Sequence, residues 1–197
     1  NESDTEAKRY LERMVRWNRR AGEAHYYLGS LAERNSDAIA ALYHYRQVGN
    51  GYEYLPAQAR IGSILVEDGL WDEARENLSR ARHQQPDKAQ QLMLLEAQLL
   101  ADRGLESDVF EFLDSVIAED PRNMELLYFR AMVGQRFGYL EILEADLRRI
   151  IEIDPDNADA LNALGYTLTD QTDRHEEAME LIEKALAIKP DEAAFID

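Results

Sequence analysis

Four prolines divide this chain at nearly equal steps. Pro86, Pro121, Pro155 and Pro190 are separated by 35, 34 and 35 residues, and each follows a segment with the apolar pattern of a helix. Proline ends a helix because its ring clashes with the preceding turn and its nitrogen carries no hydrogen. The spacing therefore predicts a chain built from repeated units of about 34 residues.

Glycines mark the middle of these units. Gly69, Gly104 and Gly138 each stand 17 residues before a proline, and glycine readily adopts the left-handed conformation that closes a helix. Each unit should therefore be a helix, a tight turn, a second helix and a proline loop. We expect an all-α fold without strands, with helices over 5–19, 22–34, 37–48, 55–68, 71–84, 88–103, 106–119, 123–137, 140–153, 158–170 and 175–188.

Small and large apolar residues alternate at fixed offsets within the units. Small residues let two helices approach closely, and large ones fill the layer between neighbouring repeats. The expected close approaches are at Gly29, Gly62, Ala97, Ala131 and Gly165, and in the second helices at Ala74, Ala81, Ala178 and Ala185. The expected layer residues are Leu78, Leu113, Leu147 and Ile182.

This pattern resembles the tetratricopeptide repeat, which has Leu-Gly in its first helix, then Ala, a large apolar residue, Ala and Pro. The resemblance implies a right-handed superhelical solenoid of helix-turn-helix repeats. It is strongest in the repeats that end at Pro86 and Pro190. It is weaker in the two between them, because Glu96 and Arg130 stand where the motif has leucine.

The repeat phase sets the expected domain organisation. We expect one array over 1–197, excised from a longer chain. Its parts would be the second helix of a partial repeat at 5–20, five repeats at 22–54, 55–88, 90–123, 124–157 and 158–192, and the start of a truncated repeat at 193–197.

Charge and composition exclude several classes of partner. The chain has 22 Lys and Arg against 39 Asp and Glu, for a net charge of −17, and it has no cysteine. Nucleic acid binding requires clustered cations, so we expect none, and no apolar run is long enough to insert into a membrane. The first 20 residues differ, with six basic and four acidic side chains, while 21–197 carry −19. A solvated helix face and a functional basic helix both remain open readings.

Candidate catalytic or metal-ligating residues are few. His175 begins a segment like a zinc-protease helix, but the second histidine of that motif falls at Met179. His25, His44 and His83 are expected to be scattered surface or groove histidines of different repeats. We therefore expect no catalytic residue, no metal site and no cofactor, and a protein that is not an enzyme.

The resemblance also implies a binding groove along the first helices of the repeats. Tyrosine and methionine offer large, adaptable contact area to a protein or peptide partner. Surrounding acids, including Glu33, Glu67, Asp102, Glu125 and Asp159, would favour a segment that carries Lys or Arg. The implied groove residues are Tyr26, Ser30, Glu33, Ser63, Leu94, Gln98, Tyr128, Met132, Gln135, Asn162, Tyr166 and Thr169.

A narrower resemblance is carried by "YYLGSLAE", "YRQVGNGYEYLPAQARIG", "LLEAQLL" and "LNALGYTLTDQTDRHEEAMELIEKAL". These segments are similar to tetratricopeptide lipoproteins of Gram-negative bacteria. That family implies a scaffold at the periplasmic face of the outer membrane, in some members an adaptor that brings substrates to a protease. Without it, a cytoplasmic location is expected. The alternatives are a structural spacer, a module that self-associates through exposed end repeats, or the repeat region of an enzyme whose catalytic domain lies elsewhere. In the second alternative, the uncovered flank at the end of the array would carry Ala185, Leu186, Phe195 and Ile196.

Overall fold

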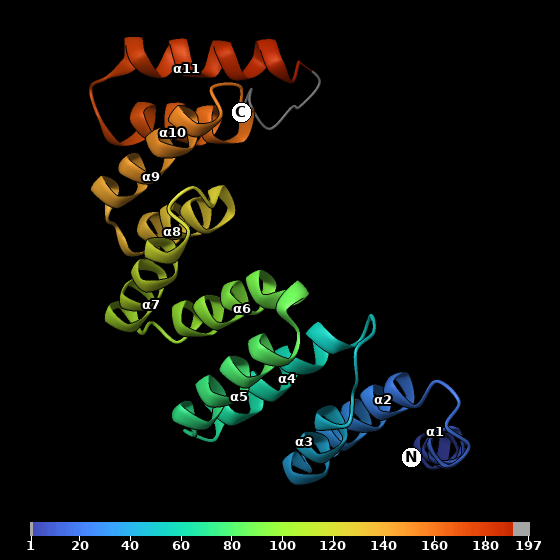
Figure 1. Ribbon diagram of the computed structural model, residues 1–197. Helices are drawn as coiled ribbons and strands as arrows, with labels where there is room; N and C mark the ends of the chain where they lie inside the picture. The colour runs from blue at the N-terminus through green and yellow to red at the C-terminus, as the bar shows by residue number, and fades with distance from the viewer. Residues whose placement is uncertain (1, 191–197) are drawn as a thin grey trace. The chain divides into compact units, whose positions relative to one another are not determined.

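The computed structural model describes the backbone of residues 2–190 and the side chains of residues 4–190. Over this range the chain forms α-helices joined by short turns and no strand, as the sequence predicts (Figure 1). The helices are α1 Glu2–Arg16, α2 Ala21–Arg34, α3 Ala38–Arg46, α4 Tyr54–Glu67, α5 Trp71–Gln84, α6 Ala89–Asp102, α7 Glu106–Glu119, α8 Met124–Phe137, α9 Leu140–Ile153, α10 Ala158–Gln171 and α11 His175–Ile188.

Most helix ends lie within two residues of their predicted positions, and α1 is the main exception. It begins and ends three residues earlier than the periodicity predicts, at Glu2 and Arg16. Asn18 has a φ of 50°, which places it in the left-handed region and ends the helix before Arg19. A short 3₁₀ turn, η1 Pro86–Lys88, precedes α6.

The predicted turn glycines close their helices as expected. Gly69, Gly104 and Gly138 have φ values of 76°, 68° and 82°, and Ser36 takes the left-handed position after α2 at 58°. Glycine adopts these angles at no steric cost because it lacks a Cβ, whereas a residue with a side chain, such as Ser36, adopts them at a cost. The left-handed turns therefore set the reversals between α4 and α5 in unit 1, residues 1–103, and between α8 and α9 in unit 2, residues 104–197.

Asx side chains start three of the helices. Asp37, Asn123 and Asn157 each accept a hydrogen bond from the backbone N–H three residues along the chain. Such a cap satisfies one of the amide groups that the first turn leaves unpaired. Two of these caps begin first helices of repeats, directly after the loops that contain Pro121 and Pro155.

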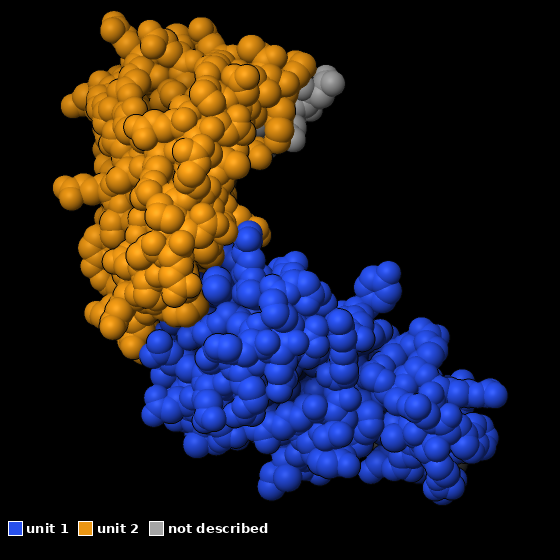
Figure 2. All heavy atoms as spheres, viewed as in Figure 1, with its two compact units in different colours: residues 1–103 blue, residues 104–197 orange. Residues whose placement is uncertain are grey.

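The chain forms two compact units, residues Asn1–Arg103 and Gly104–Asp197 (Figure 2). Helices α1 to α6 belong to unit 1, and α7 to α11 belong to unit 2. The division falls between the two helices of the expected repeat 90–123.

Among the described residues of unit 1, apolar side chains gather in two clusters. The first joins α3 and α4 through residues such as Tyr45, Ile61 and Leu65, each at most 1% exposed. The second joins α4, α5 and α6 through Tyr54, Leu78, Ala81 and Leu92. Burial of such side chains stabilises a fold by about 1.5–3 kcal/mol each, so neighbouring helices depend on one another.

Unit 2 buries its apolar residues in the same way. Ala158, Leu161 and Ala185 form a cluster between α10 and α11, and Ile151 of α9 and Leu186 pack against it. The expectation that Ala185 and Leu186 lie on an uncovered flank is wrong. Ala185 is fully buried, in agreement with its expected helix contact, and Leu186 is half-buried. The large apolar residues of α11 that are exposed are Met179 and Ile188. Phe195 and Ile196, also expected on this flank, lie outside the described residues.

Small residues permit the closest helix contacts, as predicted. A Cβ built on Gly165 of α10 would lie 2.7 Å from Ile182 Cγ1 and 3.0 Å from the Ala178 carbonyl oxygen. A Cβ on Gly29 would lie 2.7 Å from the Tyr45 ring. Figure 1 shows α10 and α11 lying side by side along their lengths, which this contact allows.

The two departures from the repeat motif are buried ion pairs. Glu96, 2% exposed, accepts hydrogen bonds from Arg75 and Arg82 of α5. In unit 2, Arg130 donates to Asp146 and Asp114. Charged groups are costly to bury unless they are paired, so these positions tie helices together through ions where other repeats use leucine.

Candidate protein-binding faces

Unit 1 carries the expected groove residues of α2, α4 and α6, which together form the unit 1 face. Tyr26, Ser30, Ser63 and Leu94 are half-buried. Gln98 is exposed, and its side-chain amide donates a hydrogen bond to Asp102 at 2.7 Å. The unit 1 face therefore offers little large apolar surface to a partner.

Tyr26 of this face belongs largely to the protein's own packing. Its ring centroid lies 5.6 Å from that of Tyr27 and 5.7 Å from that of Tyr45, and it packs against the first apolar cluster of unit 1. Edge and tilted aromatic contacts of this kind stabilise the folded state. Tyr26 therefore stabilises the fold beneath the unit 1 face, and little of its ring is available to contact a partner.

Glu33 is committed to a contact within the protein. Its carboxylate accepts hydrogen bonds from the Tyr45 hydroxyl at 2.7 Å and from the Arg60 guanidinium. The Arg60 hydrogen bond lowers the pKa of Glu33, and burial raises the pKa of Tyr45 above its ordinary value. The three side chains come from α2, α3 and α4, so this cluster joins the expected repeats 22–54 and 55–88.

Unit 2 carries the remaining groove residues on α8 and α10, which form the unit 2 face. Tyr128, Met132 and Asn162 are half-buried, while Tyr166 is 55% exposed. Gln135 and Thr169 are exposed as well. Thr169 donates its hydroxyl hydrogen to the Gly165 carbonyl oxygen at 3.0 Å. This face combines two tyrosines, a methionine and polar groups.

The electrostatics link the two helices of the unit 2 face. Burial raises the pKa of Tyr128, and the negative charge of Asp159 raises it further. The Asp159 carboxylate, at the start of α10, therefore lies near enough to act on the Tyr128 hydroxyl of α8. Asp159 also accepts a hydrogen bond from Lys189 at 2.9 Å.

The acids expected around the groove are less available than the sequence suggests. Glu33 binds Arg60, Asp102 binds Gln98, and Asp159 binds Lys189. Glu67 is exposed. A partner would therefore meet a negative surface whose strength depends on which carboxylates already bind a group of the protein. The sequence does not show which carboxylates are paired in this way.

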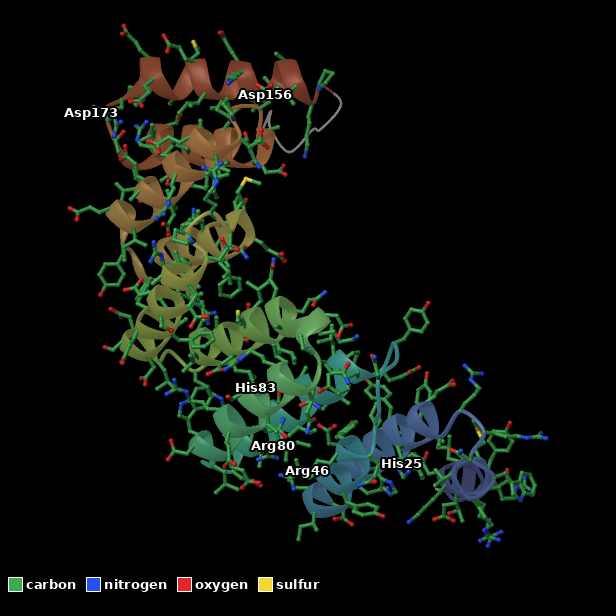
Figure 3. The ribbon with its side chains drawn as sticks, viewed as in Figure 1. His25, Arg46, Arg80, His83, Asp156 and Asp173 are labelled. Atoms are coloured by element: carbon green, nitrogen blue, oxygen red, sulfur yellow. The ribbon has the colours of Figure 1, made fainter. Side chains whose placement is uncertain are left out.

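One pair of titratable residues was missed by the sequence analysis. His25 of α2, labelled in Figure 3, and His44 of α3 have Nδ1 atoms 3.0 Å apart, and one nitrogen donates to the other. The expectation that these histidines are scattered over different repeats is wrong, since both lie in 22–54. Burial lowers the pKa of both rings. Their positions could have been read from the sequence, because His25 and His44 lie on the two paired helices of the same expected repeat.

The described residues hold no group of three or more His, Cys, Asp or Glu side chains arranged to bind a metal ion. His175 is exposed at the start of α11, and Met179 one turn further is 63% exposed. Among helices of residues 2–190, none has the length and apolar character to cross a membrane.

Comparison with known proteins agrees with this architecture. Residues 147–180 match the family model of the tetratricopeptide repeat. This part of the chain has the sequence of a tetratricopeptide repeat. The match covers α10 with the end of α9 and the start of α11, where the repeat motif is strongest.

Similar tetratricopeptide-repeat proteins span most of this chain. It is 44% identical over 174 residues, 88% of its length, to the TPR repeat-containing protein PA4667 of Pseudomonas aeruginosa, and it spans 30% of that relative's length. Among solved structures, YrrB, described as a TPR protein with an unusual peptide-binding site, is 19% identical, with a TM-score of 0.53 over 94% of this chain and 95% of that one. MamA from Desulfovibrio magneticus RS-1 is 14% identical, with a TM-score of 0.53 over 87% and 97%. At these identities the structures share the fold alone.

Proposed function

We propose that this protein is a non-enzymatic scaffold that binds protein or peptide segments on the first-helix faces of its repeats. The observation that carries this proposal is the unit 2 face, which presents Tyr166 of α10, 55% exposed, and half-buried Tyr128 and Met132 of α8. Tyrosines anchored at one edge and open at the other are typical of protein-binding surfaces, because they lose little entropy on binding.

The preferred ligand is an extended segment with apolar anchors and at least one Lys or Arg. Asp159 acts on the Tyr128 hydroxyl, and the protein carries a net charge of −17. A cation in the segment would speed the encounter, and contacts with the tyrosines would slow release. Polar groups such as Asn162 and Gln135 would bind the segment's backbone.

We also propose a more specific role for this scaffold, as an adaptor in the periplasm. Support comes from the lipoprotein-like segments of the sequence and from the 44% identity to PA4667. In that role the faces would hold a substrate and present it to a protease at the inner side of the outer membrane. Fractionation of cells that express the whole protein, followed by protease treatment of intact spheroplasts, tests the location.

Peptide binding tests the proposed face directly. We would measure fluorescence anisotropy with a labelled peptide that alternates leucine or phenylalanine with lysine, against the 197-residue chain. The pair Tyr128→Ala and Tyr166→Ala should weaken binding by more than about tenfold, at roughly 1–2 kcal/mol for each anchor. The matched control is Tyr43→Ala with Tyr52→Ala, since these tyrosines are 59% and 99% exposed outside the face.

Two readouts decide the result. Thermal unfolding must show that the Tyr128 and Tyr166 variants fold, because Tyr128 is half-buried. Rising salt should lower the association rate more than it raises the dissociation rate. Equal affinity for the wild type, the face variant and the control variant would place peptide binding elsewhere on the molecule.

Self-association is a second candidate, favoured by one observation. Met179 is 63% exposed and Ile188 is 37% exposed on α11, so the last described helix presents apolar side chains to solvent. Because these two residues are nine positions apart, they lie on opposite sides of the helix. A second copy stacked on the Met179 side would cover that side chain as a neighbouring repeat does. Light scattering over a concentration series should show association that Met179→Glu removes, and a concentration-independent monomer mass would exclude this candidate.

A further inference from the structure

Helix α1 and Trp17, the residue directly after it, carry a set of arginines and aromatic residues that the scaffold function does not use. Arg9, Arg13 and Arg16 follow one another at intervals of four and three residues, and Tyr10 and Trp17 lie beside them. Residues at these intervals share one side of a helix. We call Arg9, Tyr10, Arg13, Arg16 and Trp17 the basic stripe.

The opposite side of α1 is occupied by packing within the protein. Leu11, Met14 and Val15 are half-buried, and α1 packs against α2. All members of the basic stripe are exposed, with Tyr10 at 58% and Trp17 at 62%. The stripe therefore points away from the body of unit 1.

The arginines of the stripe differ from most others in the described residues. Elsewhere, arginines join helices by binding carboxylates. Arg46, labelled in Figure 3, binds Glu73, and Arg82 binds Glu96. Over the described side chains, Arg9, Arg13 and Arg16 have no such ion pair. Three guanidinium groups thus face solvent along about two turns of helix. Their N–H groups donate to no carboxylate among the described side chains.

The aromatic residues add a second type of contact. The Arg13 guanidinium lies 5.9 Å from the centroid of the Tyr10 ring, close enough for a cation–π interaction. Trp17 leaves most of its apolar ring open at the end of the stripe. Arginine together with exposed tyrosine and tryptophan is the composition of interface hot spots.

We propose that the basic stripe of α1 binds an acidic protein segment, with carboxylates about one helical turn apart and an apolar side chain placed on Trp17. A guanidinium binds a carboxylate through two parallel hydrogen bonds, which fixes the direction of the partner. Arginine–carboxylate pairs also join the protein's own helices, and in the basic stripe the arginines would form such pairs with a partner. The surface is distinct from the first-helix faces and does not depend on the proposed function.

Charge complementarity selects a short acidic segment over larger anionic surfaces. Residues 21–197 carry a net charge of −19, which repels a nucleic acid duplex or an anionic bilayer that extends past α1. Two acidic residues, Glu6 and Glu12, also line the surface around the stripe. An acidic segment of two or three helical turns would contact the stripe alone. Acidic residues of the protein more than about 8 Å away would repel it little, because physiological salt screens their charge.

The test uses a synthetic, labelled helical peptide with Glu at successive turns and Leu between them, and a matched peptide with Gln in place of Glu. Anisotropy with the 197-residue chain should show binding of the Glu peptide that falls several-fold from 50 to 300 mM NaCl. Arg9→Glu with Arg13→Glu should weaken it at least about tenfold. Trp17→Ala should weaken both the Glu and the Gln peptide.

The matched control is Arg103→Glu with Arg122→Glu, which changes the net charge equally at exposed positions outside α1. It should bind within about twofold of the wild type, which separates local recognition from overall repulsion. Circular dichroism confirms that α1 is intact, since the substituted residues face away from α2.

Three results would overturn the proposal. The first is equal binding of the Glu and Gln peptides, and the second is equal loss in the stripe and control variants. The third is stripe-dependent sedimentation with phosphatidylglycerol vesicles, or stripe-dependent self-association, with no binding of the Glu peptide. A failure of this test leaves the Tyr128 and Tyr166 experiment unaffected, because the two use different peptides and different helices.

Discussion

Arg130 binds both oxygens of Asp146, with Nε 2.8 Å from one and Nη2 2.6 Å from the other. Asp146 is 2% exposed, on α9, and Arg130 projects from α8 at a position where the repeat motif has leucine. Asp114 of α7 also accepts from Arg130. One arginine therefore joins three helices of unit 2, and the hydrogen bonds that it donates to Asp146 raise the Arg130 pKa.

Removal of Arg130 should destabilise the protein strongly. Arg130→Leu leaves the Asp146 carboxylate buried without its cation, and we expect a loss of about 3 kcal/mol in the free energy of unfolding. Asp146→Leu should cost less, because Arg130 keeps Asp114, which is exposed to solvent. Urea unfolding followed by circular dichroism measures both.

The double variant is the matched control for this prediction. Arg130→Leu with Asp146→Leu removes both charges and restores the leucine of the motif, so its stability should lie within about 1 kcal/mol of the wild type. A double variant as unstable as the sum of the single ones would show that the ion pair does not act as a unit.

Gly165→Ala should destabilise the contact between α10 and α11. Its Cβ would lie 2.7 Å from Ile182 and 3.0 Å from a backbone carbonyl oxygen, so the helices must separate, at a cost of roughly 1–3 kcal/mol. Gly22→Ala is the control, because Gly22 is also helical and its nearest neighbour lies at 3.8 Å. That variant should be neutral or stabilised by up to about 1 kcal/mol. Equal thermal midpoints for the two variants would contradict the predicted seam.

The His25–His44 pair should make the protein less stable as the pH falls below about 6.5. Burial lowers the pKa of both rings, and for His44 the neighbouring charges of His25 and Lys8 lower it further, while Glu12 raises it. The unfolded chain therefore takes up protons at a higher pH than the folded chain does. Stability is fully present above the ordinary histidine pKa and is lost progressively toward the lowered one.

Urea unfolding at pH 7.5, 6.5 and 5.5 measures this dependence. His25→Asn with His44→Asn should flatten it over that window, because neither replacement titrates. The carboxylates with lowered pKa, such as Glu33 and Glu177, lose their contribution only below their ordinary value near 4.5. An unchanged pH dependence in the double variant would assign the effect to other groups.

The helices and turns could be predicted because their signals are local and repeated. Pro86 and Pro155 end helices at a fixed phase, and Gly69 and Gly138 adopt the left-handed turn that the phase requires. The same phase placed Ala74 and Ala178 in helix contacts, and both are at most 1% exposed. The binding assignment of Tyr128 and Tyr166 stays a prediction, since it concerns a partner.

The sequence by itself determined the repeat length, the helix order and the small residues at the seams, because each follows from backbone preferences and apolar spacing within a few turns of chain. The tertiary structure alone decided which charges find partners. Glu96 binds Arg75 and Arg82, Glu33 binds Arg60, and His25 meets His44, each across a helix boundary. Such pairs depend on where long side chains from separate helices end in space, and no periodicity along one helix encodes that position.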